Sequence, residues 1–291
     1  MTGRASHFDR VPPPALVVGA VASVQFGSAV AKSIFDEIGA GGAVLLRTVF
    51  AAAVLTLIWR PRVRCLTGRQ LLLVLLFAMS LAGMNASFYA ALDRIPLGVA
   101  VTFEFVGPLG VAVFASRRKL DLVWVALAAA GILLLSDFGT ADLDGLGVLL
   151  ALTAGAFWAA YILLAARMGQ AIAGGGGLAL AMVLSAVLLA PLGIAEGGSD
   201  LLVPWILAVG FAVGMLSSAI PYTLELEALR RMPAGVFGVL MSLEPALAAL
   251  AGFLVLSEDL AAREVVAIAL VVVASAGAAR EASRAPALGS V

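Results

Sequence analysis

Ten long apolar stretches follow one another along this sequence, and only short connections separate them. A helix that crosses a bilayer needs about 20 mainly apolar residues. The connections contain helix breakers and charged residues, and none is long enough for a soluble domain. The sequence therefore predicts an all-α integral membrane protein of ten transmembrane helices whose main partner is the lipid bilayer. We expect the spans near 14–33, 41–59, 70–91, 97–115, 121–136, 146–166, 178–195, 203–228, 235–256 and 263–280.

Composition excludes several other classes of protein. Hydrophobic residues make up 63% of the chain and charged residues 12%, about half the charged share of soluble domains. The net charge is zero, so we expect no nucleic-acid partner. The single Cys65 and the single His7 cannot form a disulfide, a zinc site or a Cys/His catalytic pair. We expect no metal and no other cofactor.

Basic residues mark one side of the predicted bundle, because Lys and Arg accumulate in cytoplasmic loops. Fourteen of the 18 Lys and Arg fall on that side, and most Asp and Glu fall on the other. The pattern places both termini in the cytoplasm. These fourteen are Arg4, Arg10, Arg60, Arg62, Arg64, Arg69, Arg117, Arg118, Lys119, Arg167, Arg230, Arg231, Arg280 and Arg284. An alternative remains open for residues 1–31, which resemble a cleavable signal peptide and whose removal would leave nine spans.

Two stretches of the chain match at a constant offset of 137 residues. Residues 96–99 (PLGV) correspond to residues 233–236 (PAGV), and Pro108 corresponds to Pro245. The spacing between the two prolines is therefore the same in both copies. This shared offset indicates an internal repeat.

The repeat divides the chain into two five-helix halves, 1–140 and 141–291. Five is an odd number, so the second half enters the membrane inverted relative to the first. Two inverted five-helix repeats (5+5) are typical of transporters that open a central site to alternate sides of the membrane. A duplication that only stabilises a bundle is the alternative.

Three segments resemble a known family: residues 221–225 (PYTLE), residues 241–249 (MSLEPALAA) and residues 104–109 (EFVGPL). They are similar to EamA-type members of the drug/metabolite transporter superfamily, most of all the bacterial inner-membrane threonine/homoserine exporters. The resemblance covers essentially the whole chain. It implies the 5+5 fold, the inner membrane, and export of small neutral amino acids in exchange for protons. Glu227 is an additional carboxylate that departs from those exporters.

Ionisable groups inside a bilayer are expensive and are therefore candidates for function. Glu104 and Glu244 lie near the middle of spans four and nine, and each precedes a proline. A proline frees the carbonyl four residues before it, which leaves a polar notch beside the carboxylate. We expect a substrate or proton site there. The alternative is a structural pair in which Arg47 neutralises one of the two carboxylates.

Glu225 and Glu227 cannot face the same way, because two residues on an α-helix are about 200° apart. Glu225 shares a helix face with Tyr222, which could hydrogen-bond to it, and we expect both to line the cavity. Glu227 has Arg230 and Arg231 at i+3 and i+4, so we expect an interfacial ion pair there.

Arg47 lies within span two and must face inward. A guanidinium suits an amino acid's carboxylate, although a permanent salt bridge to Glu104 or Glu244 is equally open. Further polar and aromatic residues at helical spacing could line the cavity or could simply join packed helices. These are Gln25 in span one, Asn85 and Tyr89 in span three, and Trp158 in span six.

Together these features predict a secondary active exporter of small neutral amino acids, with protons as the exchanged ion. No Walker-type motif is present to bind ATP. An exporter of hydrophobic cations, drugs or other metabolites is the alternative, with the buried Glu residues as counter-ions. A channel fits the inverted repeat less well. An intramembrane enzyme fits least, because no span contains a His or a Ser-plus-base arrangement. The sequence does not fix an oligomeric state.

Overall fold

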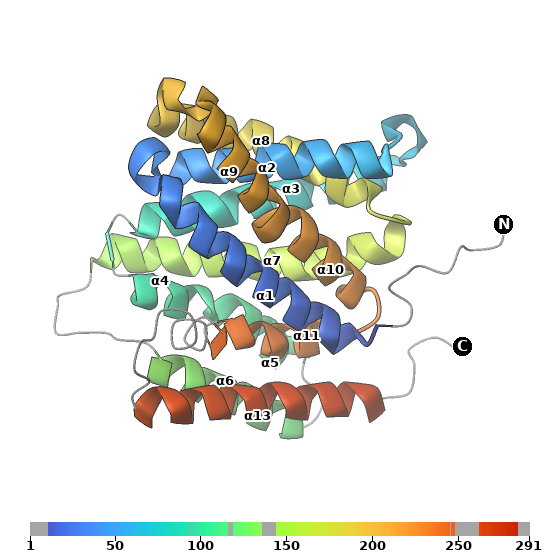
Figure 1. Ribbon diagram of the computed structural model, residues 1–291. Coiled ribbons are helices and arrows are strands. Elements are labelled where there is room, and N and C mark those ends of the chain that lie inside the picture. The colour runs from blue at the N-terminus through green and yellow to red at the C-terminus, as the bar shows by residue number, and fades with distance from the viewer. Residues whose placement is uncertain are drawn as a thin grey trace.

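The structure is a computed structural model, and it describes residues 11–92, 94–95, 97–115, 119–135, 144–244, 246–247 and 262–284. The predicted all-α architecture is confirmed, since the regular elements within these ranges are helices, with no strand (Figure 1). The α-helices are α1 (Pro13–Ala31), α2 (Phe35–Trp59), α3 (Gly68–Leu92), α4 (Leu97–Glu104), α5 (Val106–Ala115), α6 (Lys119–Leu135), α7 (Gly145–Ala171), α8 (Gly176–Gly197), α9 (Pro204–Gly214), α10 (Ile220–Leu229), α11 (Ala234–Met241) and α13 (Ala262–Arg284). Short helices are η2 (Lys32–Ile34), η3 (Val63–Cys65), η4 (Gly198–Leu202) and the π-helix η5 (Met215–Ala219).

Five helices are long and apolar enough to cross a membrane unaided. They span Phe35–Trp59, Gly68–Leu92, Gly145–Ala171, Gly176–Leu202 and Pro204–Leu229. Shorter apolar helices cover Pro13–Ser28, Val99–Ala115 and Val265–Arg280. A multi-pass membrane protein is therefore confirmed, whereas the count of ten spans stays a prediction.

The helices pack as a bundle in which neighbours in space are mostly distant in sequence. The most extensive pairings join α2 with α8, α3 with α7, and α6 with α13, while α1 packs on α10 and α5 on α11. Figure 1 shows α2, α3 and α7 running alongside one another, with α1 and α10 crossing obliquely in front of them, while α13 runs in a similar direction at the bottom of the view. Every one of these pairings joins a helix before residue 140 to one after it.

Three helices are interrupted within their apolar stretches. The fourth predicted span breaks into α4 and α5 at Phe105, three residues before Pro108. The eighth contains η5 between α9 and α10, and η5 ends two residues before Pro221. In α2, Gly39 is left-handed (φ 67°), so the regular helix starts close to the predicted residue 41.

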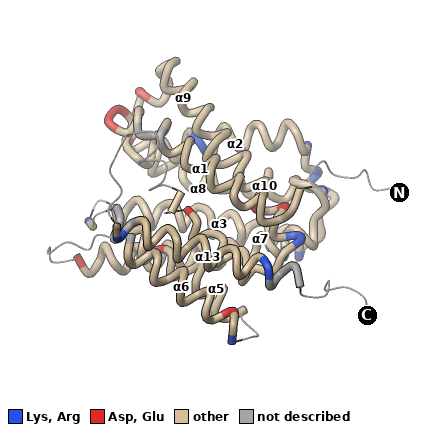
Figure 2. Tube along the Cα trace, turned by 60° about the horizontal axis from the view of Figure 1, so that its bottom comes forward, with Lys and Arg blue, Asp and Glu red and all other residues tan. Residues whose placement is uncertain are grey.

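The outer surface of the bundle is apolar, as a lipid environment requires. Large side chains such as Phe114 (93% exposed) and Leu57 (71% exposed) point away from the protein. Charged residues instead gather at the two ends of the bundle (Figure 2). Most of the basic residues lie at the end where α1 begins and α10 ends, whereas acidic residues are prominent at the opposite end.

Candidate functional site

The charged residues predicted within the spans come together from four separate parts of the chain. Arg47 comes from α2, Glu104 ends α4, Glu225 lies in α10, and Glu244 closely follows α11. The charge of Arg47 acts on both Glu104 and Glu244, and Glu244 interacts in turn with Glu104 and Glu225. The sequence predicted each residue separately, and the fold gathers them into one cluster.

Arg47 makes a hydrogen bond rather than a salt bridge. Its Nη2 donates to Oδ1 of Asn85 in α3, and the Asn85 amide donates in turn to the carbonyl of Leu81 (2.7 Å). Its Nε is buried and has no hydrogen-bond partner among the described residues. No ion pair links Arg47 to a carboxylate in the part of the chain that the structure describes. The structural pair that the sequence left open is therefore absent, and the guanidinium keeps donor capacity for a ligand.

Glu225 is held by a tyrosine from another helix. The hydroxyl of Tyr161 in α7 donates a hydrogen bond of 2.6 Å to Glu225 Oε2, and both side chains are buried. The expected partner, Tyr222, lies within hydrogen-bonding reach of Asn85 instead. That expectation was wrong, since no hydrogen bond joins Tyr222 to Glu225 among the described residues and Tyr161 reaches the carboxylate from the facing helix instead.

Glu104 is positioned by the break between α4 and α5. Pro108 has no N–H to bond the Glu104 carbonyl, and α4 ends at Glu104. A close glycine contact fixes this segment against α7. A Cβ on Gly155 would come within 2.6 Å of the Glu104 carbonyl oxygen, and a Cβ on Gly107 would collide with the Gly155 carbonyl. The glycines thus let the two backbones approach closely enough to bring Glu104 to the centre of the bundle.

Glu244 is linked to the first helix. The side-chain amide of Gln25 in α1 donates a hydrogen bond of 3.1 Å to the Glu244 backbone carbonyl. The sequence left two roles open for Gln25, lining the cavity or joining packed helices. This hydrogen bond joins packed helices. The neighbouring Pro245 lies outside the described residues, so the predicted notch beside it is not described.

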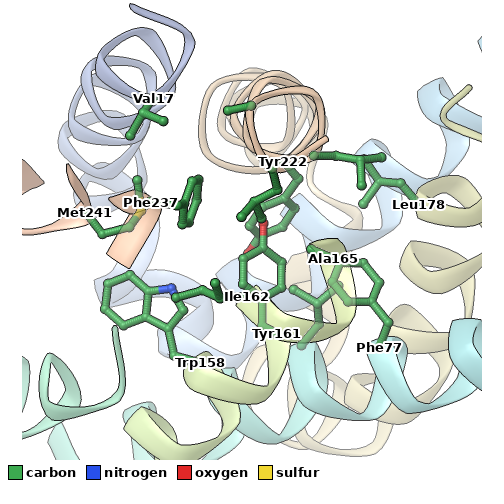
Figure 3. Packing of buried hydrophobic residues seen from close by; sticks show 14 of the residues in the cluster. Val17, Phe77, Trp158, Tyr161, Ile162, Ala165, Leu178, Tyr222, Phe237 and Met241 are labelled. Atoms are coloured by element: carbon green, nitrogen blue, oxygen red, sulfur yellow. The ribbon is translucent and has the colours of Figure 1, made fainter. Parts of the chain in front are cut away.

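Aromatic side chains, among them Phe77, Trp158, Tyr161 and Tyr222, pack together in the buried core (Figure 3). Tyr161 stacks on Phe77 (5.2 Å between ring centroids) and lies 5.7 Å from the ring of Tyr222. Trp158 meets Phe105 edge to face at 4.9 Å. Tyr89 meets Phe88 edge to face, with 6.0 Å between the ring centroids. Arg47 is near enough to act electrostatically on the predicted residues Tyr89 and Tyr222, whereas Trp158 contacts Phe105, the residue that follows Glu104.

Glu227 lies apart from this cluster. Its carboxylate pairs with Arg230 Nη1 at 2.9 Å and with Arg231 Nε at 3.4 Å. The predicted ion pairs are confirmed. Arg230 also donates to the carbonyls of Gly169 and Gly174, so this group ties the end of α10 to the end of α7.

The π-helix η5 was not predicted from the sequence, and it holds two buried serines. Ser217 and Ser218 lie in η5, and neither hydroxyl has a hydrogen-bond partner within the described chain. π-Helices are rare and occur frequently at functional sites. Here Pro221 gives the signal, since it removes the N–H that would bond the Ser217 carbonyl. The Ile220 N–H bonds Met215 O instead, five residues back.

The amino-acid sequence matches known transporters. The model of the EamA-like transporter family matches residues 145–280. The threonine/homoserine exporter RhtA of Salmonella typhimurium (strain LT2) is 40% identical over 277 residues, covering 94% of this chain and 93% of the exporter. The chain belongs to the EamA-like transporter family. RhtA of Escherichia coli K12 is likewise 40% identical, over 91% of this chain and 90% of its own length.

A more distant relative is also named a transporter, and a solved structure shares the fold. An uncharacterized transporter of Bacillus subtilis (strain 168), YwfM, is 30% identical over 228 residues, covering 75% of this chain and 77% of the transporter. A crystal structure superposes with a TM-score of 0.77 over 95% of this chain and 99% of its own chain, at 19% identity. That superposition supports the fold alone. The relatives are named as transporters, which confirms the prediction of a transporter rather than an enzyme.

Proposed function

We propose that this EamA-like transporter exports small neutral amino acids of the threonine and homoserine type. The observation that carries the proposal is Arg47, a buried guanidinium that is bound to a neutral amide and has no ionic partner in the described chain. A guanidinium presents a planar set of donors that matches a carboxylate. The relatives named threonine/homoserine exporters support the same class of substrate.

The charges around Arg47 suit a zwitterion better than a simple cation. The substrate's carboxylate would take the free donors of Arg47, and its ammonium group would face Glu104 or Glu244. Both carboxylates lie near enough for the charge of Arg47 to act on them. A hydrophobic cation would instead have to lie beside a guanidinium that forms no ion pair in the described chain. The runner-up substrate class is therefore disfavoured.

The packing of the helices supports ten spans in two inverted repeats, 1–140 and 141–291. We pair each span with the one five places later, so that α2 corresponds to α8, α6 to α13, and α5 to α11. Each of these pairs is in direct contact. The contact between α3 and α7 likewise corresponds to the contact between α10 and α1. A contact pattern that maps onto itself in this way is expected of two halves related by a two-fold axis in the membrane plane.

Alternating access follows from such a repeat, and the buried carboxylates supply a means of coupling. A carboxylate inside a bilayer is strongly favoured to be neutral or paired, so it can bind either a proton or a substrate ammonium. We propose proton antiport, with Glu225 as the first candidate carrier and Glu244 as the second. Glu225 is held by a hydroxyl rather than by a cation.

The charge asymmetry supports the bacterial inner membrane, with both termini in the cytoplasm. A cysteine at position 62 should then resist a membrane-impermeant maleimide in sealed cells, whereas one at position 200 should react. Both replacements are made in a background without Cys65. Arg62 and Asp200 are exposed, so the difference reports the side of the membrane. Labelling at position 62 alone would reverse the orientation.

The transport proposal is tested in proteoliposomes loaded with labelled threonine or homoserine, or with a lipophilic cation. We expect efflux of the amino acids, accelerated by a pH gradient, and loss of that efflux in Arg47→Gln. Arg94→Gln is the matched control, because Arg94 is exposed and pairs with Asp144 outside the cluster. Efflux of the lipophilic cation alone, unchanged in Arg47→Gln, would replace the amino-acid proposal with the cation one.

A further inference from the structure

A second site lies at the end of the bundle that carries the basic loops, away from the carboxylate cluster. It is a pocket of about 260 Å³ between the end of α2 and the beginning of α8. Its wall includes Trp59, Arg60, Arg62, Cys65, Ile172 and Gly176. None of the described residues that line it is acidic, so its electrostatic character is set by the two arginines.

Both arginines are available to a ligand. Within the described residues, neither side chain forms an ion pair or a hydrogen bond, and both are exposed. Arg60 is also the single non-glycine residue of the described chain with a left-handed backbone (φ 44°, ψ 59°). A non-glycine residue is strained in such a region, and strain of this kind clusters at ligand-binding positions. The turn at Arg60 carries the chain from α2 directly into the pocket wall.

The opposite wall is held rigidly. The Trp59 ring lies against Gly174 and Gly175, where a Cβ would collide with the indole. Arg230 donates to the carbonyls of Ile172 (3.1 Å) and Gly174 (2.5 Å) and so holds the loop between α7 and α8 in place. Helix α8 then begins at Gly176 with no side-chain cap, so its first amides add partial positive charge to the pocket.

The location points to a lipid. The pocket lies where two membrane-length helices end, and the exposed Leu57 and Ile58 (71% and 65%) precede it on the bilayer side. Trp59 is the last residue of the membrane-length helix α2, and tryptophan is enriched at such membrane interfaces. A phosphate bound by the arginines would leave acyl chains to run along this apolar face. Basic pockets at the cytoplasmic ends of spans bind the headgroups of anionic lipids.

We propose that this pocket binds the phosphate headgroup of an anionic phospholipid from the leaflet next to the basic loops. A phospholipid headgroup and free inorganic phosphate would both offer a phosphate group to the two arginines. Only the phospholipid also carries acyl chains, and this difference distinguishes the two ligands. This site is independent of the proposed transport function. A test of lipid binding therefore does not depend on which substrate the protein transports.

Cys65 provides a native reporter for the test. It is the only cysteine of the chain, it is exposed, and it lines the pocket. We compare its rate of alkylation by N-ethylmaleimide in nanodiscs of phosphatidylglycerol and of phosphatidylcholine. Phosphatidylglycerol should slow the reaction. Millimolar inorganic phosphate in phosphatidylcholine nanodiscs should not.

Matched variants separate the pocket from general surface charge. Each arginine near an anionic surface contributes about fivefold to binding, so Arg60→Gln with Arg62→Gln should weaken lipid binding about 30-fold and abolish the protection. Arg64→Gln with Arg69→Gln removes the same charge from the same loop but from residues that do not line the pocket. That control should keep the protection.

Arg62→Gln alone covers the case in which a change at the strained Arg60 prevents folding, because Arg62 is in an extended conformation (φ −100°). Native mass spectrometry of the detergent-purified protein with added phosphatidylglycerol gives a second readout, and Arg62→Gln should retain about fivefold less lipid. Equal protection in both double variants would overturn the proposal. Protection by inorganic phosphate alone would replace the lipid with a free anion.

Discussion

The hydroxyl of Tyr161 donates a hydrogen bond of 2.6 Å to Glu225 across the interface between α7 and α10. Tyr161 is 1% exposed and Glu225 is 6% exposed, so water does not compete for this bond. The carboxylate is thus oriented by a neutral donor rather than neutralised by a cation. A group held in this way can gain or lose a proton without breaking an ion pair.

Glu225→Gln is expected to uncouple transport from the pH gradient. The amide resembles the protonated carboxyl group and can still accept from Tyr161, so the variant should fold normally. It should exchange substrate for substrate but lose uphill export driven by a gradient. Counterflow and gradient-driven transport are measured in the same proteoliposomes. Glu227→Gln is the control on the same helix and should keep both activities.

Full gradient-driven transport in Glu225→Gln would reduce Glu225 to a packing residue, and the role of proton carrier would pass to Glu244. The same measurement on Glu244→Gln then decides the question. If both variants retained coupling, proton antiport itself would have to be abandoned.

Asn85→Asp is expected to fold well and to stop transport. Asn85 Oδ1 already accepts from Arg47, so a carboxylate at this position would pair with the guanidinium permanently and occupy the donors that a substrate needs. Asn85→Ala should instead lower stability, because a buried hydrogen bond to a charged group contributes about 1.5–3 kcal/mol. Thermal unfolding in detergent and threonine efflux are measured for both. Normal efflux in Asn85→Asp would show that Arg47 does not contact the substrate.

Much of this site could be predicted from the sequence, because membrane proteins expose their functional groups as charges in apolar stretches. Arg47, Glu104, Glu225 and Glu244 were identified in this way. Hydropathy and charge also placed the helices close to their observed bounds. The partners were harder to predict. A period of 3.6 residues identifies neighbours on one helix, such as Tyr222 beside Glu225.

Contacts between side chains on different helices could not be predicted from the sequence. The bond from Tyr161 to Glu225 joins residues 64 positions apart, and the bond from Gln25 to Glu244 joins residues 219 positions apart. Such contacts depend on how helices pack, which hydropathy does not encode. The π-helix was missed for a related reason, since an extra residue in one turn leaves the apolar pattern of the span intact.

Asp144 is expected to stabilise the start of α7 mainly as an N-cap. Its Oδ1 accepts from the Leu146 N–H at 2.8 Å, and its Oδ2 accepts from Arg94 at 3.1 Å. The backbone N–H of Leu146 contributes most to lowering the pKa of Asp144 below its ordinary value, and Arg94 adds to it. Because the pKa is lower in the folded state, the stabilisation is fully present at neutral pH and is lost as the pH falls through the folded pKa.

Asp144→Ala should therefore lower the melting temperature at pH 7, and its difference from the wild type should shrink below about pH 4. Asp144→Asn keeps a capping side chain and loses only an exposed ion pair, so it should stay close to the wild type. Thermal unfolding at both pH values checks this. Equal losses in the Ala and Asn variants would assign the stabilisation to Arg94 instead.

We expect that position 27 of α1 accepts only glycine, because a side chain there would not fit. A Cβ there would collide with the Ser217 hydroxyl and would come within 2.9 Å of the Ser217 backbone N in η5. The Ser23 hydroxyl, one turn earlier, donates to the Leu216 carbonyl at 2.6 Å. Helix α1 thus packs directly against the backbone of the π-helix, and a Cβ at position 27 would require that backbone to shift.

Gly27→Ala should consequently destabilise the protein by about 1–3 kcal/mol, the usual effect of overpacking, and should slow transport. Gly19→Ala is the matched control on the same helix, because a Cβ there meets only Leu224 at an ordinary 3.6 Å. Alanine is the better helix former by about 0.5–1 kcal/mol, so this control should raise the melting temperature. The two variants therefore move stability in opposite directions. Adding Ser217→Ala to Gly27→Ala removes the colliding hydroxyl and should recover part of the loss. A Gly27→Ala protein as stable and active as Gly19→Ala would show that α1 and η5 do not approach so closely in the membrane.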